Sequence, residues 1–96
     1  MAVVNLSKTE QDKLLKEKPL EEIKEVYRPL ARAVVEKYSK YPNQEKLVEL
    51  ALETVEFARQ KYLENGGERK DYKFDTYLTY FFKTAIEKFL DKQNTP

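Results

Sequence analysis

Apolar residues recur at intervals of three and four along most of this 96-residue chain, which is the period of an amphipathic α-helix. One stripe lies within residues 19–41 and consists of Ile23, Val26, Leu30, Val34 and Tyr38. A second, running to about residue 63, consists of Leu47, Leu50, Ala51, Val55, Ala58 and Tyr62. Because no segment shows the alternation of a strand, the pattern predicts an all-α fold.

The last predicted helix, at residues 76–92, carries two apolar stripes. One contains Tyr77, Phe81 and Ala85, and the other Leu78, Phe82, Ile86 and Phe89. The simplest interpretation is that these aromatic residues fill a small core. Tyr80 lies opposite the second stripe and is the best candidate for an exposed ring. Tyr72 and Phe74 precede the helix on a loop, where either exposure or burial fits the pattern.

Polar residues at three positions predict where helices begin. Ser7-Lys8-Thr9-Glu10 has the spacing of a capping box, which places a short helix between this segment and Pro19. Asn43 follows Pro42 and is expected to cap the helix that runs to about residue 63. Asp75 is expected to cap the last helix in the same way.

Proline and glycine mark the expected interruptions. Pro29 lies inside the stripe of residues 19–41, and because proline lacks a backbone N–H, we expect a kink or a break near Tyr27-Arg28. Asn65-Gly66-Gly67 is expected to end the third helix and open a polar loop. Residues 93–96 should fray.

Length and composition indicate one small domain. The chain is 41% hydrophobic and 36% charged, enough for one core with a well-solvated surface. We expect a bundle of three to four helices spanning residues 1–96, with residues 1–18 as an N-terminal extension. A formal net charge of +1 supplies no general attraction toward nucleic acid, so any such binding must rest on local placement.

The chain contains neither cysteine nor histidine. Disulfides, thiolate metal sites and histidine-based nucleophile pairs are therefore excluded. We expect no catalytic residues, no metal, no cofactor and no small-molecule substrate. Since no apolar run approaches about 18 residues, we also expect no membrane association and a cytoplasmic location.

Residues 72–86 read Tyr-Lys-Phe-Asp-Thr-Tyr-Leu-Thr-Tyr-Phe-Phe-Lys-Thr-Ala-Ile. This segment resembles the motif Tyr-Lys-Phe-Ser-Thr-Tyr-Ala-Thr-Trp-Trp-Ile-Arg-Gln-Ala-Ile of region 2 of bacterial sigma factors, and it agrees at more than half of the positions. Looser similarity extends upstream, through residues 27–30 and 46–49, so the resemblance covers roughly residues 20–90. It implies a small orthogonal helical bundle.

In that family, the aromatic motif captures the non-template strand of the minus-ten promoter element as the duplex opens. The resemblance implies that Tyr72 and Phe74 line a pocket for a flipped base and that Tyr77 lies beside it. It places Tyr80 and Phe81 where the family has a pair of tryptophans. The residues implied to bind nucleic acid are Tyr72, Lys73, Phe74, Tyr77, Tyr80, Phe81, Lys83, Thr84 and Lys88.

Some positions depart from the family pattern. Thr84 replaces a base-reading glutamine, and its short side chain cannot make a bidentate amide contact. Glu87 replaces a threonine that faces DNA, and a carboxylate there would repel phosphate. Lys73, Lys83 and Lys88 keep positive charge, but nearby acidic residues balance it.

A second motif of the family docks on RNA polymerase. The resemblance places that partner surface at Glu45, Lys46, Glu49, Glu53 and Glu56, where the four glutamates follow one another at spacings of four, four and three. Such a stripe is also what a solvated helix face looks like. In this chain Lys46 replaces an aspartate and Leu50 a glutamate of the docking motif.

Three functions remain open from the sequence. The first is a sigma-like transcription initiation protein that docks on RNA polymerase core and binds melted, single-stranded promoter DNA. The second is a sigma mimic, a protein interaction module that binds an anti-sigma factor or another transcription regulator. The third is an unrelated helical adaptor whose motif matches by coincidence.

Overall fold

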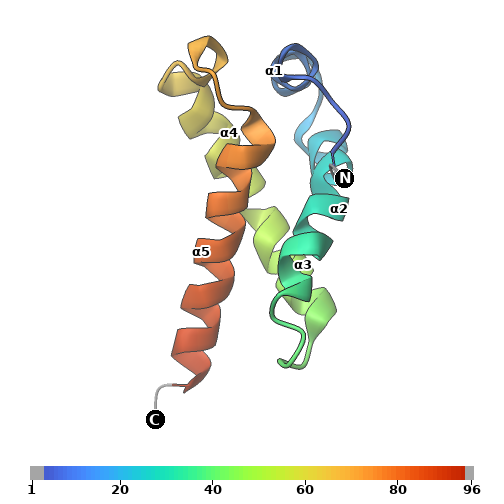
Figure 1. Ribbon diagram of the computed structural model, residues 1–96, viewed down its shortest axis with the longest axis vertical. Helices are drawn as coiled ribbons and strands as arrows, with labels where there is room; N and C mark the ends of the chain where they lie inside the picture. The colour runs from blue at the N-terminus through green and yellow to red at the C-terminus, as the bar shows by residue number, and fades with distance from the viewer. Residues whose placement is uncertain (1–3, 95–96) are drawn as a thin grey trace.

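The computed structural model describes residues 4–94, and its regular elements are all helical (Figure 1). In chain order these are α1 (Lys8–Glu17), α2 (Leu20–Glu36), α3 (Gln44–Glu53), α4 (Val55–Glu64), the single 3₁₀ turn η1 (Gly67–Arg69) and α5 (Phe74–Asn94). The molecule is elongated, measuring 43 × 26 × 23 Å. The predicted all-α bundle is confirmed.

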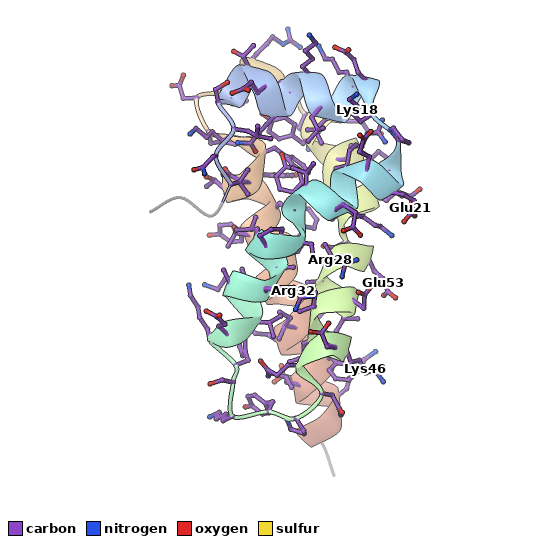
Figure 2. All side chains as sticks on the ribbon, turned by 90° about the vertical axis from the view of Figure 1, so that its right-hand side faces the viewer. Lys18, Glu21, Arg28, Arg32, Lys46 and Glu53 are labelled. Carbon is purple, nitrogen blue, oxygen red and sulfur yellow. The ribbon has the colours of Figure 1, made fainter. Side chains whose placement is uncertain are left out.

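The long helices run along the bundle, and α1 lies across one end (Figures 1 and 2). Helices α2 and α5 lie along the front in Figure 1, while α3 and α4 follow one another behind them, from α2 toward α5. The capping box of α1 forms as predicted. Ser7 Oγ accepts a hydrogen bond from the Glu10 N–H at 3.1 Å, and Glu10 Oε1 accepts one from the Ser7 N–H at 3.0 Å.

Helix α2 runs without interruption through Pro29, so the break considered near Tyr27-Arg28 is absent. A proline inside a helix costs about 3 kcal/mol or more, because one hydrogen bond is lost and the ring crowds the preceding turn. Here Tyr27 and Ala31 are fully buried on either side of the exposed proline. Burial of the apolar face on both sides offsets that cost.

The single helix predicted up to residue 63 is divided at Thr54 into α3 and α4. Both the N–H and the hydroxyl of Thr54 donate to the carbonyl of Ala51, at 3.0 and 2.7 Å. The hydroxyl thus competes for a backbone acceptor, a known way for Thr to bend a helix. The bend lets α3 pack against α2 and α4 pack against the first half of α5.

The two predicted side-chain caps downstream are not formed. Asn43 precedes α3 in the left-handed region, with φ 64°, and its side chain makes no capping bond. Asparagine tolerates this conformation better than most residues, which is its role here. Helix α5 begins at Phe74 instead of after Asp75, and the Asp75 N–H donates to Gln11 of α1.

One hydrophobic core runs the length of the bundle. The residues predicted to face inward from α3, α4 and α5 are buried or half-buried. On α2 the stripe is centred differently, because Tyr27, Ala31 and Val35 are buried while Val26 and Leu30 are half-buried, and Tyr38 lies beyond the end of this helix. The core consists of Val4, Leu15, Ile23, Tyr27, Ala31, Val34, Val35, Leu47, Val48, Ala51, Leu52, Val55, Ala58, Tyr62, Phe74, Leu78, Phe82, Ile86 and Leu90.

Gln11 is a fully buried polar residue at the α1 end of this core. Its Oε1 accepts hydrogen bonds from the Tyr27 hydroxyl and from the Asp75 N–H, both at 2.9 Å. Its Nε2 donates to the carbonyl of Leu6 at 3.0 Å. Burial raises the pKa of Tyr27 well above its usual value, which keeps this hydroxyl protonated as the donor. One amide therefore joins α1, α2 and the start of α5.

A second polar cluster joins α1 to the end of α4. The buried Tyr62 hydroxyl donates to Asp12 Oδ1 at 2.8 Å, and Lys8 Nζ donates to the Tyr62 oxygen at 3.1 Å. Lys8 also donates to Asp12 Oδ2 at 2.9 Å and to the carbonyl of Gly67 at 3.1 Å. Gly67 packs directly on the Tyr62 ring, where any Cβ would overlap the ring carbons. The cluster fixes the turn that follows α4.

We expect Gln11→Ala to lower the free energy of unfolding by about 2 to 6 kcal/mol, since it leaves two buried donors without an acceptor at about 1–3 kcal/mol each. Urea denaturation followed by circular dichroism measures the change. Gln60→Ala is the matched control, because Gln60 is exposed and bonds only to Glu64. A loss no larger than that of the control would contradict the role given to Gln11.

Candidate nucleic-acid interface

Two aromatic side chains near the start of α5 point in opposite directions, one into the core and one outward. Phe74 is fully buried, and its ring packs edge-on against Tyr27 and Tyr62, with centroids 5.3 and 5.2 Å away. The expectation that Phe74 lines an exposed base pocket is therefore wrong. Gln11 binds the next backbone N–H and holds the start of α5 against the core. Tyr72, two residues earlier, is 38% exposed.

A groove lies beside Tyr72 on the outer face of α5. It has a volume of about 490 Å³ and is lined by Tyr72, Thr76, Tyr77, Tyr80 and Phe81. The Tyr72 and Tyr77 rings are stacked, with centroids 5.9 Å apart and planes 15° from parallel. Tyr80 is 77% exposed, which confirms it as the exposed ring of this helix. We call this set of residues the aromatic groove.

A second hollow of about 520 Å³ continues from the aromatic groove along α5. It is lined by Thr76, Thr79, Tyr80, Lys83, Thr84 and Glu87. Tyr80 forms part of both hollows, so it stands between them. The predicted residues Lys83 and Thr84 thus lie next to the exposed ring, and Lys73 is exposed at the start of the same helix.

The charges along this face are mixed. Lys73, Lys83 and Lys88 are exposed, as a surface that meets phosphate requires. Glu87 lines the second hollow, and its carboxylate accepts a hydrogen bond from the Tyr38 hydroxyl at 2.8 Å. Burial, together with this bond, raises the pKa of Tyr38 to about 12, so the hydroxyl remains a donor at neutral pH. Glu87 is therefore held in place beside the hollow.

The predicted partner surface is divided into two parts. Glu45 pairs with Arg32 at 2.8 Å, and Glu49 pairs with Arg28 at 2.7 Å, so α2 neutralises this half. The hydrogen bond from Arg28 holds the pKa of Glu49 below its usual value. In the part of the chain that the structure describes, Glu53 and Glu56 make no ion pair, and both are exposed.

Lys46 differs from the glutamates around it. Its ammonium group lies 5.4 Å from the centre of the Phe89 ring on α5, a cation–π contact between two helices. The predicted partner surface thus brings together only Glu53 and Glu56 as carboxylates without an internal cation. The other glutamates are already engaged within the bundle.

Phe57 is the exposed aromatic residue that the sequence pattern missed. It is 52% exposed on α4, and its ring packs edge-on against Phe81 with centroids 5.8 Å apart. The available signal was its position, because Phe57 lies outside the stripe that contains Val55, Ala58 and Tyr62. An apolar residue off the core stripe is a candidate for the surface.

Two further geometric tests bear on the function. Among residues 4–94, no three carboxylates lie close enough together to hold a metal ion. Over the same range, no helix combines the length and the apolar character needed to cross a bilayer.

We expect Phe74→Ala to lower the free energy of unfolding by about 3–5 kcal/mol, because it removes a ring from the closed core. Tyr80→Ala should change it by no more than about 0.5 kcal/mol, since this ring is exposed. Thermal and urea unfolding of both variants measures the difference. Equal effects of the two substitutions would contradict the inward and outward assignment.

Comparison of the chain with protein-family models, with curated proteins and with solved structures gave no match.

Proposed function

We propose that this domain is a sigma-like transcription initiation protein that docks on RNA polymerase and holds melted promoter DNA in the aromatic groove. The observation that carries the proposal is the exposed Tyr80 ring beside the groove that Tyr72 and Tyr77 help to line. The resemblance of residues 72–86 to the sigma-factor motif supports it. Phe74 takes no direct part, because its ring lies in the core.

The chemistry of the groove suits an unstacked base. A base pulled out of a duplex loses its stacking, and a fixed aromatic ring returns about 1–3 kcal/mol per base without reading the sequence. Tyr77 is held by contacts with Tyr72 and Phe81, so one wall of the groove is positioned in advance. Lys73, just before α5, and Lys83 on α5 are both exposed and are suited to contact the phosphates on either side.

In this proposal, Glu53 and Glu56 form the contact with polymerase. Because Arg32 and Arg28 already pair with Glu45 and Glu49, those two carboxylates have less charge to offer a partner. Glu53 and Glu56 are exposed near the junction of α3 and α4. A basic partner surface would meet them without first breaking an internal ion pair.

Glu87 favours a second candidate, the sigma mimic that binds a transcription regulator. Its carboxylate lies in the hollow beside Tyr80, where it would repel a phosphate backbone. With a formal net charge of +1, the chain does not compensate for that repulsion globally. In this alternative the same rings bind an apolar protein segment. Binding to DNA in the presence of polymerase distinguishes the two candidates.

Tyr80→Ala should weaken binding of a fluorescent single-stranded DNA by roughly fivefold to a hundredfold, the equivalent of losing one stacked base at about 1–3 kcal/mol. Fluorescence anisotropy with polymerase core present measures it. Tyr41→Ala is the control, because Tyr41 lies in the turn between α2 and α3 and is not among the residues that line the groove. With two lysine–phosphate contacts, from Lys73 and Lys83, log K should fall against log salt with a slope of about −1.4. Absent or salt-independent binding would contradict the DNA-binding function.

Glu56→Lys should reduce co-elution of the chain with purified polymerase core in size-exclusion chromatography, because it places a cation opposite a basic surface. Glu21→Lys makes the same charge change on an exposed residue in the first turn of α2, apart from the proposed surface, and should leave co-elution unchanged. If the unmodified chain does not co-elute with core but binds a regulator, the sigma mimic is the better description.

A further inference from the structure

A third hollow lies between α5 and the junction of α3 with α4. Its volume is about 410 Å³, and it is lined by Leu50, Glu53, Thr54, Phe57, Phe81, Thr84, Ala85 and Lys88. Phe81 separates it from the aromatic groove, and Phe57 forms its most exposed apolar wall. Of its lining residues, Glu53 also belongs to the proposed polymerase contact and Phe81 to the aromatic groove, but neither proposal fills the hollow itself. We call it the Phe57 hollow.

The apolar surface of the Phe57 hollow is costly to leave in water. Burying a phenylalanine side chain stabilises a protein, and Phe57 is 52% exposed. The Lys61 ammonium lies 5.4 Å from the centre of this ring and shields part of it. Rings exposed beside half-buried apolar side chains such as Leu50 and Ala85 are typical of protein contact surfaces.

The two charged residues of the Phe57 hollow have opposite signs and come from opposite walls. Glu53 belongs to α3, and Lys88 belongs to α5. Neither makes an ion pair within residues 4–94, so both charges are available to a binding partner. A partner that fills the hollow must therefore present an apolar centre, a cation near Glu53 and an anion near Lys88.

We propose that the occupant is a second copy of this chain, bound through the same hollow. A symmetric dimer requires a surface that complements itself, because a residue i of one copy that contacts residue j of the other is matched by a contact of j with i. If that axis runs along the hollow, the acidic wall of one copy faces the basic wall of the other. Glu53 then pairs with Lys88 of the second copy, Lys88 pairs with Glu53, and each Phe57 ring packs against the α5 wall of the other copy.

This dimer goes beyond the proposed function and does not depend on it. Phe57 is not among the residues that line the aromatic groove, and Tyr80 is not among those that line the Phe57 hollow. Substitutions at the two positions therefore separate self-association from nucleic-acid binding. A monomeric Phe57→Ser variant that still binds single-stranded DNA would leave the DNA-binding function standing.

Sedimentation velocity over a range of protein concentrations tests the proposal. The unmodified chain should shift from monomer to dimer as concentration rises, and Phe57→Ser should remain a monomer. Tyr80→Ser is the matched control, because it also removes an exposed ring but lies outside the hollow, and it should dimerise like the unmodified chain. A chain that stays monomeric throughout, or that grows beyond a dimer without limit, overturns the proposal.

Charge reversal at Glu53 and Lys88 tests the proposed pairing directly. In the Lys88→Glu variant, two carboxylates face each other across each Glu53–residue 88 contact. In the Glu53→Lys variant, two ammonium groups face each other there. Each substitution should therefore weaken dimerisation at least about tenfold. The double variant Glu53→Lys/Lys88→Glu restores opposite charges across the axis and should recover dimerisation. Failure of the double variant to recover it, while circular dichroism shows a folded chain, overturns the assigned geometry.

Discussion

The side-chain amide of Gln11 joins three helices whose residues are distant in the chain. It accepts hydrogen bonds from the buried Tyr27 hydroxyl on α2 and from the Asp75 N–H at the start of α5. A buried hydroxyl or N–H without a partner costs about 1–3 kcal/mol, so this one side chain makes burial of both groups tolerable. Among residues 4–94, no buried side-chain nitrogen or oxygen lacks a partner.

The position of α5 follows from this contact. The first turn of a helix has N–H groups with no acceptor of its own, and here α1 supplies one from outside. Phe74 points into the core between Tyr27 and Tyr62, and the helical period then turns Leu78 and Phe82 inward. Tyr80 lies opposite to them and is exposed. The aromatic groove is thus set by the rotation of α5 about its own axis.

Local sequence signals predicted much of the fold. The capping box at Ser7, the all-helical period and most of the buried positions on α3, α4 and α5 depend on neighbours within a turn or two, and these predictions are confirmed. The bend at Thr54 and the use of Gln11 as an external cap were not predicted. Both arise from packing between helices, which the period along one helix does not encode.

The candidate site was predictable to the same degree. Exposure of Tyr80 follows from its place opposite the core stripe and was predicted correctly. Phe74 lies at a loop boundary, where periodicity does not decide between burial and exposure, and only the rings of Tyr27 and Tyr62 settle it. The pairing of Glu45 and Glu49 with arginines from α2 could not be predicted from the sequence either, because it depends on how two helices face each other.

The bonds from Lys8 to the Gly67 carbonyl and from Gln11 to the Asp75 N–H have a consequence for the dynamics of the protein. They join the two ends of the loop after α4 to a single short helix. If α1 detaches, the loop loses both attachments together, and the buried Tyr62 hydroxyl loses its acceptor on Asp12. The first helix and this distant loop therefore form one cooperative unit of local unfolding.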